Sequence, residues 1–364
     1  MIRSYRVMVT PGYARRQSEA RLFNGTGEPS PCPMGQENRP LVPKADRLPD
    51  YIYQGDDPYL PAVCDYILQE YGSFYSQEDA VIPCPLILET DDSNPQDVRL
   101  WGIFVLDNYR LVNTTLIGES GGATPGLVHL KAVDGGWQVT SMESVGDGED
   151  FQKDVERIFG MRKGLLDRYQ GITSDDIDQA RLRSASDYVN WYGLNITQMQ
   201  DFGWKPVALI NAPETAEADQ IVHYSGALGY ALDDDLRLFS YISFGDNEEG
   251  FAGVDALEGI SLDIQRREGE NADAVAQSLS EGLDRPVIEN ATIGEDSLAA
   301  LCVRDAALRE GVVKCAYVVA VNDGCLVVTV SNTYYAVEGD PVVEGGAAAL
   351  ETLLDSFRLV DNEQ

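Results

Sequence analysis

The chain contains 364 residues, 44% of them hydrophobic and 24% charged, which is an ordinary composition for a globular protein and enough chain for two domains. Its 60 acidic residues outnumber its 27 basic residues, and the formal net charge is -33. A field of this sign repels phosphate backbones and anionic lipid head groups, so the composition argues against nucleic-acid binding and against a membrane-surface role.

The first 50 residues differ in composition from the rest of the chain. They hold 7 of the 17 prolines, and repeated prolines block both helix hydrogen bonds and strand pairing. Residues 1–50 are therefore predicted to be a disordered or irregular Pro-rich tail. No apolar run typical of a signal peptide is visible there, and no run in the chain approaches the roughly 18 residues of a transmembrane segment. Taken literally, this predicts a cytoplasmic protein, unless the start codon is misplaced.

Residues 51–160 are predicted to form a first domain. A helix over 58–71 has its apolar residues at helical spacing. It is followed by an antiparallel meander with strands over 81–89, 98–111, 113–119, 127–133 and 137–145. The longest of these strands has two apolar faces, with Leu100, Phe104 and Leu106 on one and Trp101, Ile103 and Val105 on the other. A helix through Phe159 ends the domain.

Residues 161–211 are predicted to be a helical connector packed between two domains. One helix begins near Thr173 or Ser174, and 195–207 is expected to be a short helical piece that Gly203 and Pro206 end. Phe202 and Trp204 in that piece are expected to pack where the domains meet. The acidic, small-residue segment 212–219 that follows is the best linker candidate.

Residues 212–364 are predicted to form the second domain. Strands are expected over 229–232, 238–244, 257–266 and 296–304, with helices over 271–283 and 345–357. The segment 312–335 reads as a hairpin with its turn at Asn322-Asp323-Gly324. Because both of its strands are apolar on successive residues, the hairpin is expected in the middle of a sheet with both faces at least partly covered.

One short motif matches a catalytic pattern. Gly118-Glu119-Ser120-Gly121-Gly122 fits the G-x-S-x-G of a nucleophile elbow. An elbow is followed by a helix, whereas here 123–126 lead into another strand. The trypsin-like order is also missing, because the first histidine, His129, comes after the serine. A glycine-rich hairpin loop is the favoured interpretation.

The two histidines limit acid–base chemistry near neutral pH. His129 lies on the polar face of the predicted meander and is interpreted as a solvated strand residue, with a catalyst as the alternative. His223, near a strand start, has no partner motif. The acidic clusters Asp233-Asp234-Asp235 and Gly245-Asp246-Asn247-Glu248-Glu249-Gly250 lack the spacing of a calcium loop, so solvated turns are favoured.

Six cysteines without a C-x-x-C pair indicate neither a metal cluster nor a disulfide scaffold. Two bridges, Cys302 to Cys315 and Cys64 to Cys84, are possible from the predicted strands, with buried free thiols as the alternative. No catalytic, cofactor-binding or metal-binding residue is assigned, and no cofactor is expected.

The helix over 58–71, the meander ending in Gly136-Trp137-Gln138-Val139-Thr140, and the helix entered through 146–151 resemble small cystatin-like or NTF2-like domains of exported Gram-positive proteins. The second half resembles the PsbP/Mog1-like α-β-α sandwich, through Gly250-Phe251, the helix over 271–283, the hairpin and the ending 353–360. The resemblance implies an α+β fold with a helix plus antiparallel meander sheet, a helical connector, and an α-β-α sandwich with an antiparallel sheet.

Both families imply export to the cell surface, often as a lipoprotein, and neither has an obligatory catalytic set. The leading hypothesis is therefore a non-enzymatic, extracytoplasmic binding protein for an unknown protein, peptide or cell-envelope ligand. One alternative is an enzyme, a hydrolase or isomerase, that uses the polar sheet face near His129 with a carboxylate partner. Another is an acidic inhibitor or immunity protein whose surface caps a basic partner.

Overall fold

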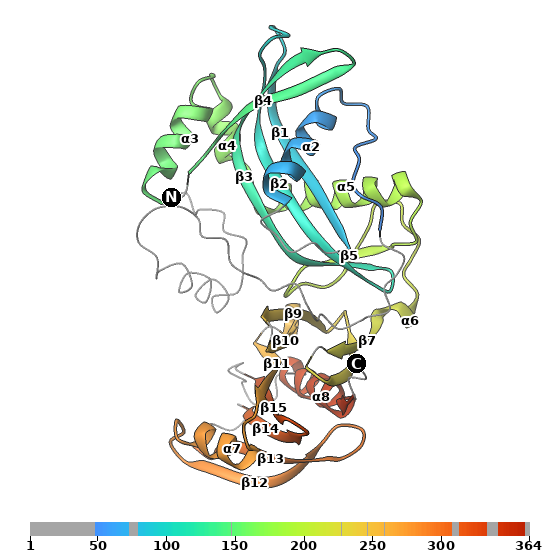
Figure 1. The fold of residues 1–364 in the computed structure, drawn as a ribbon, viewed down its shortest axis with the longest axis vertical. Coiled ribbons are helices and arrows are strands. Elements are labelled where there is room, and N and C mark those ends of the chain that lie inside the picture. Colours follow the sequence, from blue (N-terminus) through green and yellow to red (C-terminus); the bar gives the residue numbers. More distant parts are fainter. Residues whose placement is uncertain are drawn as a thin grey trace. The chain divides into compact units, whose positions relative to one another are not determined.

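The computed structural model describes residues 48–72, 79–146, 148–226, 228–245, 247–257, 259–307, 313–332 and 341–360. The fold is α+β, as the sequence predicts, with helices packed on antiparallel sheets (Figure 1). The chain forms two compact units: one runs to Met199 and adds Val207–Thr215, and the other holds Gln200–Pro206 and the residues from Ala216 onward. Of the predicted tail, residues 1–47 lie outside the described residues, while Leu48 is buried.

The first unit is built on a meander of four long strands. These are β1 (Ala80–Asp91), β2 (Val98–Val112), β3 (Thr115–Val133) and β4 (Gly136–Ser144). Two short strands, β5 (Gln198–Gln200) and β6 (Val207–Ala208), continue the sheet beyond β3. Its helices are α2 (Leu60–Tyr71), α3 (Phe151–Phe159), α4 (Leu165–Gln170) and α5 (Ser174–Tyr192), with a 3-10 turn, Gly148–Asp150, before α3.

Both faces of this sheet are apolar and covered, and the predicted division of β2 is confirmed. Leu100, Phe104 and Leu106 pack in one core cluster with Val63 and Ile67 of α2. On the opposite face Trp101, Ile103 and Val105 pack with core residues of the other three helices, among them Phe159, Leu165, Tyr188 and Val189. Residues 161–199, part of the predicted helical connector, contribute side chains to this core.

The glycine-rich segment 118–126 is part of a continuous strand, so the prediction of a loop there is wrong. β3 pairs with β2 from Thr115 to Leu130, with one bulge beside Gly118. A Cβ on Gly121 would lie 2.3 Å from Asp107 Oδ1, and a Cβ on Gly126 would lie 2.5 Å from the carbonyl oxygen of Glu143. Glycine is required at these positions because the neighbouring strands approach too closely for a side chain.

The predicted helical piece over 195–207 is also wrong. Met199 pairs with Val207 and Gln198 pairs with Ala208, so the segment forms the β5–β6 pair with a turn between them. The backbone N–H of Thr197 donates to the carbonyl oxygen of Thr114 at 2.8 Å, which fixes the segment to the start of β3. Sheet pairing has overridden a weak local helix pattern.

The second unit contains two antiparallel sheets. The larger has the order β12-β13-β14-β15-β11-β10-β9, and the smaller has the order β16-β8-β7. The strands are β7 (Ile221–Gly226), β8 (Tyr230–Asp235), β9 (Phe239–Gly245), β10 (Glu248–Gly253), β11 (Ile260–Glu268), β12 (Pro286–Ile293), β13 (Leu298–Asp305), β14 (Val313–Val321), β15 (Gly324–Asn332) and β16 (Arg358–Leu359). The helices are α6 (Glu217–Gln220), α7 (Ala272–Ser280) and α8 (Pro341–Asp355), with a 3-10 turn, Asp255–Leu257.

The predicted hairpin is confirmed as β14 and β15, paired in register from Val313 opposite Asn332 to Val321 opposite Gly324. It lies between β13 and β11, inside the larger sheet. Successive residues of β15 from Cys325 to Val328 are buried, as expected for a strand covered on both faces. Val318, Cys325 and Val327 pack against Val275 and Ala276 of α7.

The cysteines of the described residues, all buried, are free, so neither of the two possible disulfides forms. The register of β13 and β14 explains why Cys302 and Cys315 do not form a bridge, because Cys302 lies opposite Tyr317 and Cys315 lies opposite Arg304. The two thiols are diagonal neighbours that hydrogen-bond, and burial raises the pKa of Cys302 to about 11. No helix in the described part of the chain is long and apolar enough to cross a membrane.

Candidate functional site

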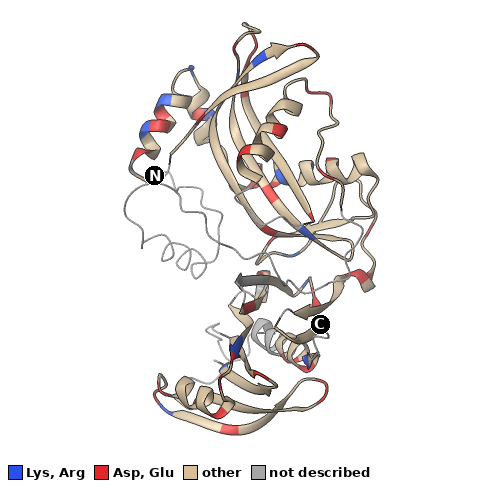
Figure 2. Ribbon diagram, viewed as in Figure 1, with Lys and Arg blue, Asp and Glu red and all other residues tan. Residues whose placement is uncertain are grey.

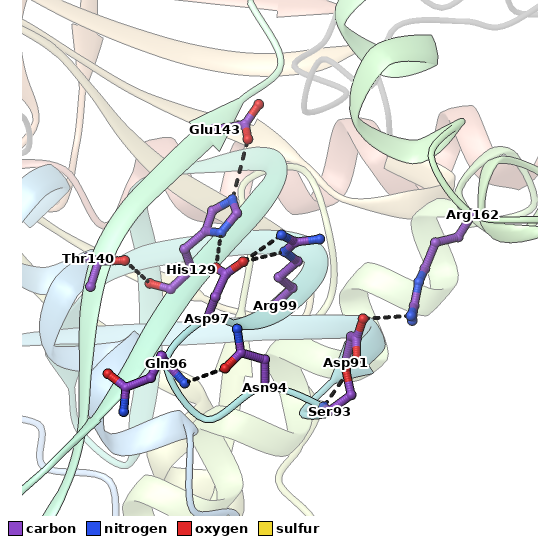
Figure 3. Close-up of polar contacts among 10 residues, drawn as sticks. All are labelled: Asp91, Ser93, Asn94, Gln96, Asp97, Arg99, His129, Thr140, Glu143 and Arg162. Atoms are coloured by element: carbon purple, nitrogen blue, oxygen red, sulfur yellow. Dashed lines mark hydrogen bonds and ion pairs between the residues drawn. The ribbon is translucent and has the colours of Figure 1, made fainter.

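The polar group around His129 is the first candidate site, and strand register builds it. The β2–β3 ladder puts His129 opposite Arg99, and the β3–β4 ladder puts it opposite Ser141 beside a bulge. Asp97, just before β2, and Glu143, on β4, then lie on either side of the imidazole (Figure 3). His129 Nδ1 is 2.7 Å from Asp97 Oδ1, and Nε2 is 3.3 Å from Glu143 Oε1.

The β1–β2 connection holds Asp97 in this position through side chains that bond to their own backbone. Asp91 Oδ1 accepts hydrogen bonds from the N–H and the hydroxyl of Ser93 at 3.2 and 2.6 Å. Asn94 Oδ1 accepts from the N–H of Gln96 at 3.0 Å. Such turns are typical of Asp and Asn and order a short connection locally.

Arginines extend the group on both sides into a network of ion pairs. Arg99 contacts Asp97, while Arg157 of α3 contacts Glu143 and also Asp154. Arg162, between α3 and α4, pairs its guanidinium nitrogens with the carboxylates of Glu89 and Asp91 on β1, at 2.5 and 2.7 Å. The same guanidinium lies over the ring of Trp101, 5.1 Å from its centroid. This network attaches α3 and the segment before α4 to the edge of the sheet.

This geometry makes His129 a poor general base. Each ring nitrogen faces a carboxylate, so neither is left to accept a proton from a substrate. The hydrogen bond from His129 is the main reason that the pKa of Asp97 lies below its ordinary value. The interpretation of His129 as a solvated residue is wrong, because its side chain is only 18% exposed. Its carboxylate partners could not be read from the sequence, since Asp97 is brought close only by strand pairing.

Replacing His129 with glutamine is expected to raise the pKa of Asp97, because the charge-assisted hydrogen bond is lost. A lowered pKa means that this pair stabilises the fold above the unfolded value of about 3.9 and that the contribution is lost as pH falls through the folded value. The cost in unfolding free energy is expected to be no more than about 1 kcal/mol. Carboxyl NMR titration of wild type and His129→Gln measures the shift, and an unchanged Asp97 pKa would contradict the assigned contact.

The G-x-S-x-G motif does not form a nucleophile site with His129. Ser120 lies opposite Asn108, and its hydroxyl is buried without a hydrogen-bond partner. His129 is farther along the same strand, at about 3.3 Å per residue roughly 30 Å away. The side-chain amide of Asn108 is likewise buried and unpaired. This part of the sheet is therefore packed interior.

The two acidic clusters of the second unit are not solvated turns throughout. Asp233 contacts His223 at 2.6 Å, and Asp235 contacts Arg237 at 2.7 Å, whereas Asp234 between them is fully buried. In the other cluster Glu249 is buried on β10 and accepts a hydrogen bond from the Tyr230 hydroxyl at 2.5 Å. Within the described ranges, no group of three or more His, Cys, Asp or Glu side chains is placed to hold a metal ion.

Comparison with known proteins gives no family. No protein-family model matches the chain, and no curated protein matches it. Among solved structures, the chain is similar to the apo structure of immunity protein TplEi of T6SS from Pseudomonas aeruginosa, at 11% sequence identity and a TM-score of 0.23. The match covers 85% of this chain and 86% of that chain. A likeness at this TM-score establishes neither a shared fold nor a shared function.

Proposed function

We propose that the chain is a non-enzymatic binding protein whose acidic surface takes a basic protein partner. The observation that carries the proposal is the net charge of -33. Asp and Glu residues occur along the ribbon of both units, as Figure 2 shows. A field of this size attracts a cationic protein and speeds its association, and it disfavours acidic competitors.

Internal ion pairs leave this imbalance unchanged, because each pair uses one charge of each sign. Many arginines contact carboxylates of their own chain, among them Arg99, Arg157, Arg162, Arg181, Arg237 and Arg304. By contrast, residues 48–98 contain no Lys or Arg, and the side chains of Asp56, Asp57, Asp65 and Glu70 in that stretch are exposed. In the part of the chain that the structure describes, many cations thus already face a carboxylate, and carboxylates remain in excess.

The arrangement around His129 supports the non-enzymatic part of the proposal. Its imidazole is held by Asp97 and Glu143, which makes it part of the ion-pair network. An enzyme that used this face would need a ring nitrogen free to reach substrate. An extracytoplasmic location is also proposed; it rests on the resemblance to exported proteins. Cell fractionation with the intact mass of the mature chain tests the location.

Immobilised full-length protein is expected to retain a specific basic protein from host lysate at low salt and to release it near 1 M salt, where the Debye length is about 3 Å. Mass spectrometry then identifies the retained protein for purification and titration. The matched control replaces Asp56, Asp57, Asp65 and Glu70 by Asn or Gln, which removes charge without touching the core, and its association rate is expected to fall. Retention of no basic protein at low salt would reject the proposal.

A further inference from the structure

The second unit has exposed apolar side chains on the segment Gln200–Pro206 and on segments hydrogen-bonded to its neighbours. The side chain of Trp204 is 57% exposed, although tryptophan is normally well buried. Ile221, at the start of β7, and Leu238, in the β8–β9 connection, are 43% and 37% exposed. We call these three side chains and the segments that carry them the Trp204 surface.

The backbone that carries Trp204 is firmly anchored. The buried Gln200 side chain places Nε2 within 2.8–3.3 Å of three backbone carbonyl oxygens, those of Trp204, Leu236 and Phe239. The N–H of Gly203 donates to the buried Ser240 hydroxyl at 2.7 Å, and Gly203 has a φ of 82° that favours glycine. The backbone that carries the indole is thus already ordered, so binding costs less ordering of the loop.

The segments of this surface are joined by hydrogen bonds and are acidic. Leu236 N–H donates to the Gln220 carbonyl oxygen at 2.9 Å, and Val254 N–H donates to the Leu238 carbonyl oxygen at 3.0 Å. The cations Lys205 and Arg237 are each paired with carboxylates. Their partners are Asp255, Glu217 and Asp235, and with Asp201 and Asp219 this part of the unit holds five carboxylates against two cations, a net charge of -3.

We propose that the Trp204 surface is where the basic partner docks, with the indole entering an apolar hollow on the partner and the carboxylates facing its Lys and Arg side chains. The proposal rests on the proposed function and assigns that function its contact site. Tryptophan is among the residues that dominate binding energy when it sits centrally within a polar rim. A second copy of this chain fits poorly, because two molecules of net charge -33 repel each other.

The test compares full-length Trp204→Ala and Trp204→Phe with Ile288→Ala, which truncates an exposed apolar side chain on β12 of the same unit. The probes are the basic protein retained by wild type, purified after identification, and poly-L-lysine, which binds by charge alone. Trp204→Ala is expected to weaken binding of the retained protein at least tenfold, Trp204→Phe less, and Ile288→Ala not measurably. Poly-L-lysine should bind all four proteins equally, and the melting temperatures should agree.

Fluorescence gives a second readout, because Trp204 is more exposed to acrylamide than the buried Trp101. Binding of the retained protein should reduce acrylamide quenching in wild type and leave it unchanged in Trp204→Ala. Equal affinity of wild type and Trp204→Ala for the retained protein would overturn this inference and leave the proposed function standing. Absence of any retained basic protein would instead overturn both.

Discussion

Replacing Arg181 with methionine is expected to lower the free energy of unfolding of the first unit by about 3–5 kcal/mol. Arg181 of α5 places Nε 2.6 Å from Asp107 Oδ2 on β2, and both side chains are largely buried, at 15% and 8% exposure. Methionine keeps the aliphatic stem and a high helix propensity, so the change removes mainly the charge. Asp107 would then be a buried carboxylate without its cation, which is far more costly than loss of an exposed pair.

The control for this prediction is Asp178→Asn. Asp178 is the other carboxylate near Arg181, at 3.5 Å, but its side chain is 61% exposed. Its loss is expected to cost less than about 0.5 kcal/mol. The double variant Asp107→Asn with Arg181→Met should recover part of the lost stability, because the uncompensated charge is gone. Hydrogen exchange of β2 and β3 amides follows the first unit alone, and a loss below about 1 kcal/mol for Arg181→Met would contradict the assigned role.

Elements with strong local patterns were predicted well from the sequence. The hairpin of β14 and β15 combines two long β-branched runs with an Asp-Gly turn. The helix predicted to begin near Thr173 or Ser174 is α5, which begins at Ser174 and has Thr173 as its N-cap in a capping box with Asp176. In both cases the residues that decide the structure are adjacent in the chain. The two apolar faces of β2 could likewise be predicted, because side-chain alternation is a local property of a strand.

The failures concern features that depend on contacts between distant segments. The glycines of 118–126 indicated a loop, but their small size serves close packing of β3 between its neighbours. The two carboxylates on His129 come from Asp97 and Glu143, which only strand register brings together. The segment 195–207 was predicted to be helical, but pairing of Met199 with Val207 makes it the β5–β6 pair.

Replacing Asp234 with asparagine is expected to stabilise the second unit at neutral pH, by up to about 4 kcal/mol at pH 7. Asp234 on β8 is fully buried, and neither of its carboxylate oxygens has a hydrogen-bond partner. Burial, with a smaller contribution from the nearby charge of Asp235, raises the pKa of Asp234 well above its ordinary value. Asparagine has nearly the same shape and cannot ionise, so it avoids the cost of a buried negative charge.

The effect has a defined pH dependence. The folded state holds the Asp234 proton more tightly than the unfolded state, so ionisation of this group does not lower stability below the unfolded pKa of about 3.9. As pH rises from there toward the folded pKa of Asp234, the free energy of unfolding of wild type falls by about 1.4 kcal/mol per pH unit because of this group. The stability difference between Asp234→Asn and wild type should therefore be small near pH 4 and grow toward neutral pH.

Asp233→Asn is the matched control, because it lies on the same strand but contacts His223 and Arg358 and is half exposed. It is expected to lose a little stability and to show no gain that grows with pH. Carboxyls with lowered pKa values, such as Asp97 and Asp305, make the folded state more stable as pH rises. Their contribution is the same in variant and wild type, so it cancels when the two are compared. Hydrogen exchange of β14 and β15 amides at about pH 4.5 and about pH 7 measures the difference for the second unit. A variant equal to wild type at both pH values would show that the Asp234 carboxyl has a partner or solvent access in the folded protein.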